Sequence, residues 1–113
     1  MNSLACLALI VYMESRGEAL ITQHYVASVA IQRAKQEEVS LCKSMKKPRA
    51  YSWFWDKVNT KVDPKQLEVS KTVAKQELQR QTLQGRLYFN ECRLGKRYKT
   101  QLKLIKSGGL CFY

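Results

Sequence analysis

The segment Cys6–Glu18, CLALIVYMESRGE, constrains the fold of this chain more than any other part of it. Leu7, Ile10 and Glu14 are spaced three and four residues apart, so a helix places them on one face. The apolar face of this helix therefore ends at a carboxylate. Gly17 follows, and a glycine in the left-handed conformation commonly ends a helix. We predict that Glu14 lies in the last helical turn, on the buried face.

The predicted position of Glu14 suits this residue to acid chemistry. Apolar surroundings and the partial negative charge at a helix C-terminus both disfavour a charged carboxylate, so both raise its pKa. A carboxyl that keeps its proton near neutral pH can act as a general acid. The alternative is that Glu14 is a boundary residue that faces solvent or pairs with a cation. Arg33, at the end of the apolar stripe of a second predicted helix, would pair with Glu14 or Glu18 in a structural or a catalytic role.

Length and charge limit the class of protein. A chain of 113 residues is expected to form one domain, residues 1–113, with a single modest core. Hydrophobic residues make up 45% of the chain, which is enough for a packed globule. The net charge of +11 indicates an anionic partner, and nucleic acid, a membrane surface and an acidic cell-wall polymer all qualify. Charge alone does not choose among these partners.

The cysteines and the histidine do not form a metal-binding pattern. The four cysteines include no CxxC pair and His24 is the one histidine, so no metal site is expected. Cys6, inside the apolar helix, is predicted to be a buried thiol. Cys92 and Cys111 flank a basic segment and would be bridged if the protein meets an oxidising compartment.

The apolar segment Leu4–Met13 is predicted to be a core helix rather than a membrane span or a signal peptide. It has about ten residues, whereas a span needs about twenty. No Lys or Arg precedes it, as a signal peptide would require. We therefore expect the protein to be made in the cytoplasm without a signal peptide. Something else would carry it to a target outside the cytoplasm.

Hydrophobic periodicity predicts a mainly α-helical domain with a small C-terminal β element. The predicted helices are Ser3–Arg16, Thr22–Lys35, Val39–Met45 and one that begins at Asp63-Pro64 and runs to about Leu83. The apolar side of the last helix is expected to include Leu67, Ala74 and Leu78. The predicted strands are Gly85–Asn90 and Leu110–Tyr113, the second lying beside Leu87–Phe89. Between them, Arg93–Lys106 carries six cations and no acidic residue, which predicts a solvated binding loop or a short helix.

Four aromatic residues follow Pro48 closely, namely Tyr51, Trp53, Phe54 and Trp55. They either plug a small core or form the wall of a groove, and we predict that the segment is divided between the two roles. Aromatic rings stack on sugar faces, and nearby Lys and Arg side chains meet carboxylates or phosphates. Aromatics among basic residues also suit single-stranded nucleic acid.

Several short motifs occur in a fixed order along nearly the whole chain. The first is Glu14-Ser-Arg-Gly-Glu18, followed by Gln23, Val26, Val29 and Arg33. The later ones are Cys42 with Tyr51-Ser-Trp53, then Leu87-Tyr-Phe-Asn90, then Gly108 with Phe112-Tyr113. This order resembles the SleB-like cell wall hydrolases, whose pattern reads E-A-R-G-E, G-Q, V-A-x-V-x-x-N-R, C…F-S-W, A-L-Y-F-N and G-x-H-x-F-Y. The departures are Thr22, Gln32 and Leu110, the last of which replaces the closing His. The short, basic chain is most similar to the phage members, which are endolysins for host lysis.

The resemblance implies a lysozyme-like, mainly α-helical fold that cleaves the β-1,4 bond between N-acetylmuramic acid and N-acetylglucosamine in peptidoglycan. It implies that Glu14 is the catalytic acid and that no metal or cofactor is required. Glu18 is a second catalytic candidate by its position one turn later. The glycan-binding candidates are Tyr51, Ser52, Trp53, Tyr88 and Asn90. The expected partners of this monomer are peptidoglycan strands and, through basic residues, the anionic cell wall or membrane surface.

The type of reaction depends on a second carboxylate. A hydrolysing glycosidase places one about 5 Å or about 6.5–9.5 Å from the acid. Because no second carboxylate is unambiguous, the sequence predicts a lytic transglycosylase, in which one Glu acts twice and the muramic 6-hydroxyl attacks. The alternative is a two-carboxylate muramidase with Glu18 or Asp56 as the partner of Glu14.

Two other classes of protein compete with an enzyme. A nucleic-acid-binding module would stack bases on Tyr51–Trp55 and contact phosphates with Arg93–Lys106. Nucleic-acid binding does not explain why Glu14 and Glu18 lie at the end of an apolar stripe, so we predict no nucleic-acid partner. A structural wall-binding module would keep the groove without turnover.

Overall fold

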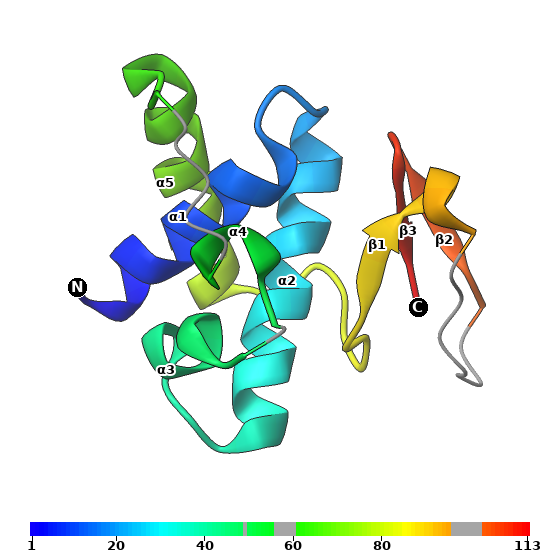
Figure 1. Cartoon of the computed structure of the whole chain (residues 1–113), viewed down its shortest axis with the longest axis horizontal. Helices are drawn as coiled ribbons and strands as arrows, with labels where there is room; N and C mark the ends of the chain where they lie inside the picture. Colours follow the sequence, from blue (N-terminus) through cyan, green and yellow to red (C-terminus); the bar gives the residue numbers. More distant parts are fainter. Residues whose placement is uncertain (49, 56–60, 96–102) are drawn as a thin grey trace.

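The computed structural model describes residues 1–48, 50–55, 61–95 and 103–113, and its mainly α-helical architecture confirms the predicted fold class (Figure 1). Its helices are α1 (Ser3–Ser15), α2 (Leu20–Glu37), α3 (Leu41–Lys46), α4 (Ser52–Trp55) and α5 (Pro64–Gln79), with a 3₁₀ helix η1 (Cys92–Leu94). Its strands are β1 (Phe89–Glu91), β2 (Ile105–Ser107) and β3 (Leu110–Phe112). The strands form one antiparallel sheet in the order β1-β3-β2. In Figure 1 the sheet lies beside α2, on the side away from α5.

Helix α1 is the centre of the fold, as its apolar sequence predicts. The Asn2 side chain caps it by accepting a hydrogen bond from the Ala5 backbone N–H at 2.8 Å. The helix ends before Gly17, which adopts a left-handed φ of +81°. Helices α5, α2 and α3 all pack against α1. Its buried residues are Cys6, Leu7, Ala8, Ile10, Val11, Tyr12 and Ser15. A helix that is buried on most of its circumference needs apolar residues all round, which this sequence provides.

Helix α5 starts where the sequence predicts but ends earlier. The Asp63 side chain accepts a hydrogen bond from Lys65 N–H at 2.9 Å, so Asp63 is the N-cap and Pro64 the first helical residue. The helix ends at Gln79 rather than near Leu83. Its buried side chains are Ser70, Val73, Ala74 and Glu77. The predicted apolar side is therefore wrong at Leu78, which is 44% exposed, because the core-facing stripe is rotated onto Glu77.

The small sheet packs on α2. As predicted, the C-terminal segment returns beside the segment around residue 89, with Phe89 opposite Phe112. The Phe112 ring also meets Tyr25 of α2 edge-on, with ring centroids 5.5 Å apart. Thr22 of α2 and Ser107 of β2 share a hydrogen bond of 2.6 Å. These contacts fix the sheet against one end of α2.

The predicted loop or short helix over Arg93–Lys106 needs correction at both ends. The chain forms η1 at Cys92–Leu94 and the strand β2 at Ile105–Ser107, while residues 96–102 lie outside the described residues. Strand β2 was missed because its one cation, Lys106, belongs to a basic segment that is typical of a solvated loop. The strand forms by pairing with β3 across the turn at Gly108, and the sequence pattern does not indicate this contact.

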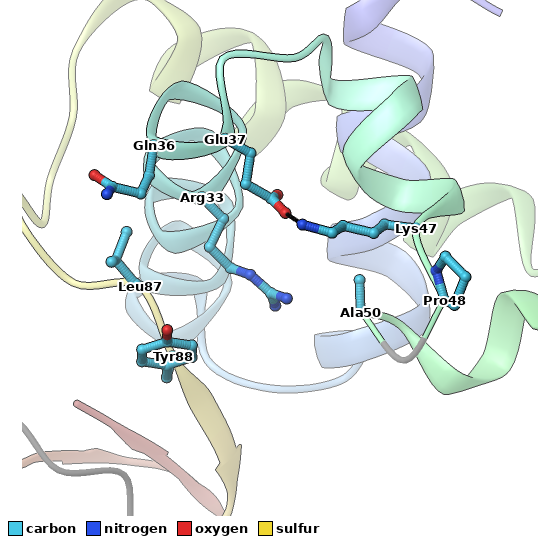
Figure 2. A pocket seen from close by; sticks show the side chains of 8 residues that line it. All are labelled: Arg33, Gln36, Glu37, Lys47, Pro48, Ala50, Leu87 and Tyr88. Carbon is cyan, nitrogen blue, oxygen red and sulfur yellow. Dashed lines mark hydrogen bonds and ion pairs between the residues drawn. The ribbon is translucent and has the colours of Figure 1, made fainter.

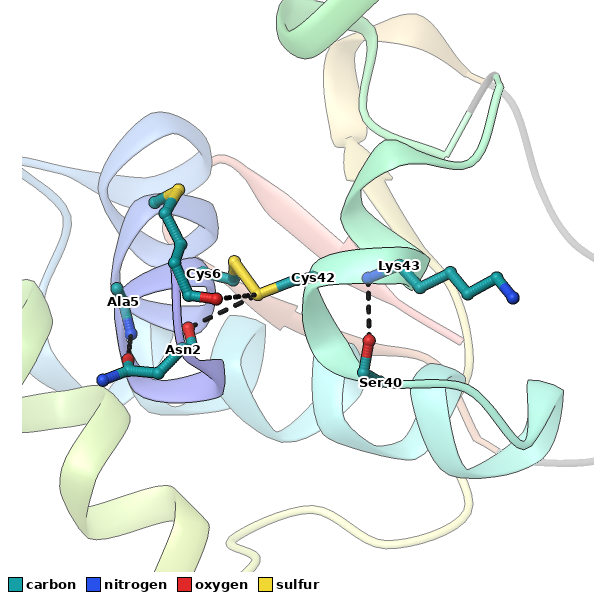
Figure 3. The surroundings of a disulfide bond; sticks show 7 residues. Asn2, Ala5, Cys6, Ser40, Cys42 and Lys43 are labelled. Atoms are coloured by element: carbon teal, nitrogen blue, oxygen red, sulfur yellow. Dashed lines mark hydrogen bonds between the residues drawn. A yellow bond between two sulfur atoms is a disulfide. The ribbon is translucent and has the colours of Figure 1, made fainter.

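The predicted buried thiol at Cys6 is wrong, because Cys6 forms a disulfide with Cys42 that ties α1 to α3 (Figure 3). Cys6 is buried as expected, but burial in an apolar helix says nothing of a partner 36 residues away. The Cys42 sulfur also contacts the Asn2 carbonyl oxygen at 3.4 Å. A second disulfide joins Cys92 to Cys111, the pair that the sequence marks as bridgeable.

Removing the Cys6–Cys42 bridge is expected to destabilise the fold. The bridge closes a loop of 36 residues, and the loss of such a cross-link typically lowers the free energy of unfolding by about 2–4 kcal/mol. Denaturant unfolding of the double variant Cys6→Ala/Cys42→Ala measures the difference. A reductant should lower the melting temperature of the parent more than that of this variant. Equal stabilities of the parent and the variant would contradict the prediction.

Candidate active-site cleft

A cavity of about 450 Å³ lies where the end of α1 faces the sheet. Its helical wall consists of Met13, Glu14, Arg33, Ala50, Ser52 and Trp53. Its sheet wall consists of Phe89, Asn90, Glu91, Arg93, Leu94 and Leu110. The cleft therefore combines aromatic rings, an amide, two carboxyl groups and two guanidinium groups. Pockets that bind small molecules or polymer segments commonly have this mixture of apolar walls and few polar groups.

Glu14 lies in the last turn of α1 and reaches this cleft, as the sequence predicts. Its Oε1 accepts a hydrogen bond of 2.9 Å from the indole Nε1–H of Trp53. Burial is the largest effect on the pKa of Glu14 and raises it. The hydrogen bond from Trp53 and the charge of Arg33 lower the pKa, and the charge of Glu91 raises it. The net effect is a raised pKa. A carboxyl with a raised pKa at the wall of a cleft is suited to donate a proton.

The aromatic segment is divided between core and cleft, in line with its predicted dual role. Ser52 and Trp53 line the cleft, and Trp53 also packs on the core. Tyr51, predicted to line the groove, is instead buried with 1% of its surface exposed. The Arg33 guanidinium lies over its ring at 5.1 Å from the centroid, and burial raises the pKa of Tyr51 to about 12. Tyr51 thus acts as a support beneath Arg33 rather than as a glycan contact.

Asn90 and Tyr88, the candidates on the sheet side, lie in different cavities. Asn90 of β1 lines the cleft of Glu14, and its Oδ1 accepts a hydrogen bond of 3.4 Å from the Tyr113 hydroxyl. Tyr88 is 41% exposed and lines a second cavity of about 340 Å³ with Leu87, Gln36 and the Glu37–Lys47 ion pair (Figure 2). Arg33 and Ala50 line both cavities, so the two adjoin.

The structure does not bring Glu18 into the cleft. Its carboxylate occupies the space beside Gly108, where a Cβ would otherwise lie, and so it packs against the turn between β2 and β3. Gly17, in the left-handed conformation, turns the chain between Glu14 and Glu18, so the two side chains extend to different parts of the molecule. Glu18 lines neither cavity that contains a predicted glycan-binding residue. Asp56, the other partner considered for Glu14, lies outside the described residues.

Glu91 is the cleft carboxylate that the sequence does not reveal. It is the last residue of β1, lines the same cavity as Glu14 and forms an ion pair with Arg93 at 2.7 Å. Its charge contributes to the raised pKa of Glu14, which places the two groups within electrostatic reach. Neither periodicity nor a motif distinguishes Glu91 from the other acidic residues. Only the pairing of β1 with β3 brings it to the cleft.

Glu77 of α5 is a fully buried carboxylate in a different setting. It accepts hydrogen bonds from Ser28 Oγ at 2.6 Å, from Thr82 N–H at 2.8 Å and from Thr82 Oγ1 at 2.6 Å. His24 Nδ1 lies 2.6 Å from its Oε2. Burial alone would raise the pKa of Glu77, but the hydrogen bonds from Ser28, Thr82 and His24 outweigh it, and the pKa is lowered. Glu77 is thus an ionised structural group, in contrast to Glu14.

Comparison with models of protein families, with curated proteins and with solved structures finds no match for this chain. The resemblance to cell wall hydrolases therefore rests on the short sequence motifs alone. The side chains that line the cleft are a separate observation. Among the described residues, no helix is both long enough and apolar enough to cross a membrane.

Proposed function

We propose that this chain is a peptidoglycan-degrading glycosidase that cleaves the β-1,4 bond between N-acetylmuramic acid and N-acetylglucosamine. The observation that carries the proposal is Glu14, a carboxyl group of raised pKa that Trp53 holds at the wall of a cleft. Breaking a glycosidic bond requires an acid that protonates the leaving oxygen, and Glu14 has the position and the proton affinity for this step. The motif resemblance assigns the same role to Glu14.

The other groups in the cleft are suited to a sugar polymer with acidic substituents. Trp53 and Phe89 contribute aromatic rings to the lining of the cleft, and aromatic rings pack against the apolar faces of pyranose rings. The side-chain amide of Asn90 can form hydrogen bonds with an N-acetyl group. Arg33 and Arg93 offer positive charge for carboxylates of the muramic substituent or its peptide. The cavity lined by Tyr88 adjoins the cleft and enlarges the surface that a polymer could contact.

The fate of the cleaved sugar separates two candidate reactions. In a lytic transglycosylase the muramic 6-hydroxyl attacks and leaves a 1,6-anhydro end, and the sequence favours this reaction because it offers no clear second carboxylate. The described cleft, however, contains Glu91 as well as Glu14. Hydrolysis by a two-carboxylate muramidase is therefore the candidate that the geometry supports better.

Digestion of purified peptidoglycan, followed by mass spectrometry of the soluble products, tests the proposed function. We expect fragments that end in a muramic acid residue, released while the peptide stems stay intact. A 1,6-anhydro end has a mass lower by one water than a hydrolysed end, so the same spectra distinguish the two reactions. Products cut only within the peptides, or no soluble products at all, would refute the proposal.

The positive charge of the chain is expected to concentrate it on the anionic wall or membrane surface. Among the described cations of the basic segment, Arg93, Lys103 and Lys106 are exposed, and residues 96–102 lie outside the described residues. Attraction between exposed charges is screened over about 8 Å at physiological ionic strength, so binding to purified walls should weaken as salt rises. A pull-down with cell walls over a salt series measures this. Binding that does not change with salt would contradict the prediction, and tight sequence-specific DNA binding would favour the nucleic-acid alternative.

A further inference from the structure

We infer that Glu91 is the second catalytic carboxylate of this cleft and that the chain hydrolyses its substrate. The inference rests on the proposed function and assigns the residue that would complete it. Glu14 enters the cavity from the end of α1, and Glu91 enters it from the end of β1. A glycan in the cavity would therefore have within reach a carboxyl group from the helical wall and one from the sheet wall, and most glycosidases use a pair of carboxyl groups beside the scissile bond.

The backbone at Glu91 is fixed by three neighbouring contacts. Glu91 is in register with Leu110 of β3, a buried residue that also lines the cleft. The next residue, Cys92, donates its backbone N–H to the Gly109 carbonyl at 2.9 Å. Cys92 is also bridged to Cys111. A catalytic group must be held within a fraction of an ångström, and strand pairing plus a disulfide provides such support.

The two carboxyl groups have environments suited to different tasks. Glu14 is largely surrounded by protein and receives a hydrogen bond from Trp53. The Glu91 side chain is 50% exposed and forms an ion pair with Arg93 at 2.7 Å. A pair of carboxyl groups in contrasting surroundings is how glycosidases divide the work between an acid and a negatively charged partner. Glu14 therefore takes the acid role and Glu91 the role of the anion.

The reaction then balances with water as the only co-reactant. Glu14 gives its proton to the glycosidic oxygen as the bond from this oxygen to the anomeric carbon breaks, and the leaving sugar keeps the bonding electron pair. Glu91 faces the electron-poor anomeric carbon, and it either bonds to this carbon directly or takes a proton from the water that does. In both routes the anomeric carbon gains the hydroxyl of water, the proton lost by Glu14 is replaced from water, and a reducing muramic end results.

The test compares Glu91→Gln with Glu14→Gln and with Glu68→Gln in the full chain, each checked for an unchanged melting temperature. Glu68 is an exposed residue of α5 outside the cleft, so its variant controls for the loss of a carboxylate. We expect Glu91→Gln to release peptidoglycan fragments at least about a hundredfold more slowly than the parent, as Glu14→Gln does. Glu68→Gln should match the parent. The parent should leave reducing muramic ends.

A second readout separates catalysis from a structural role. In Glu91→Ala, added azide can occupy the vacated space, restore cleavage and appear in the product as a glycosyl azide. A residue that only supports the sheet would not be rescued in this way. The inference is overturned if Glu91→Gln keeps the parent rate, if the parent makes only 1,6-anhydro ends, or if Glu18→Gln is inactive while Glu91→Gln is active. If the parent does not cut the glycan at all, the proposed function itself fails.

Discussion

Glu14→Gln is expected to release peptidoglycan fragments about 10²–10⁴ times more slowly than the parent, because a positioned general acid contributes this much to a rate. Glutamine keeps the shape of the side chain and can still accept the 2.9 Å hydrogen bond from Trp53, but it has no proton to donate to the glycosidic oxygen. The measurement is the initial rate of fragment release from purified walls at equal concentrations of folded protein.

Stability measurements provide the control for this variant. The pKa of Glu14 is raised above the unfolded value of 4.5, mainly by burial, so the folded state holds its proton more tightly than the unfolded state. As the pH rises above 4.5, the unfolded state ionises this carboxyl group more readily than the folded state does, so the group increasingly destabilises the fold. Glu14→Gln should therefore be at least as stable as the parent at neutral pH. A folded variant that clears peptidoglycan at the parent rate would remove Glu14 from the mechanism.

Glu77→Ala is expected to lower the free energy of unfolding by at least about 1–3 kcal/mol, the cost of leaving a buried hydrogen-bonding group without its partner. The substitution leaves Ser28 Oγ, Thr82 N–H and His24 without the carboxylate that they contact. Denaturant unfolding measures the loss. Glu68→Ala is the matched control on the same helix, because Glu68 is 73% exposed and its ion pair with Lys71 spans 3.3 Å at the surface. That variant should stay within about 0.5 kcal/mol of the parent.

The effect of Glu77 should also depend on pH. Hydrogen bonds from Ser28, Thr82 and His24 outweigh the effect of burial and hold its pKa below the unfolded value of 4.5. For a lowered carboxyl pKa, the stabilisation is fully present above the unfolded value and is lost as the pH falls through the folded one. The stability difference between the parent and Glu77→Ala should therefore shrink below pH 4.5. A difference that stays constant into acid would show that the charge of Glu77 is not its source.

Local sequence rules predict the parts of this fold that short segments determine by themselves. The apolar run before Glu14 predicts helix α1 and the place of the carboxyl at its end. Asp63-Pro64 predicts the start of α5, because an N-cap acceptor and a proline satisfy the first turn without tertiary help. The motifs around Trp53 and Asn90 likewise indicate two residues that line the cleft.

The features that sequence reasoning missed all depend on contacts between distant segments. Tyr51 and Trp53 are close in the chain and similar in chemistry, yet one lies beneath Arg33 and the other faces the cleft. The burial of Glu77, a charged residue inside a helix, becomes favourable through Ser28 and His24 of α2 and through Thr82 beyond α5. Glu91 reaches the cleft only because β1 pairs with β3. The hydrophobic periodicity of a short segment does not indicate which distant segments it contacts.

The two disulfides have a consequence for how the cleft can move. All four cysteines are used, with Cys6–Cys42 within the helices and Cys92–Cys111 within the sheet region. Apart from the chain itself, noncovalent contacts such as Tyr25 with Phe112 join these two cross-linked units, and the cleft lies at their junction. No disulfide joins the two units, so opening the sheet away from the helices would break only noncovalent contacts, including those of Leu110 and Phe112 with the shared core. Amide hydrogen exchange should detect the sheet opening as one cooperative unit, at a lower free energy than the opening of α1.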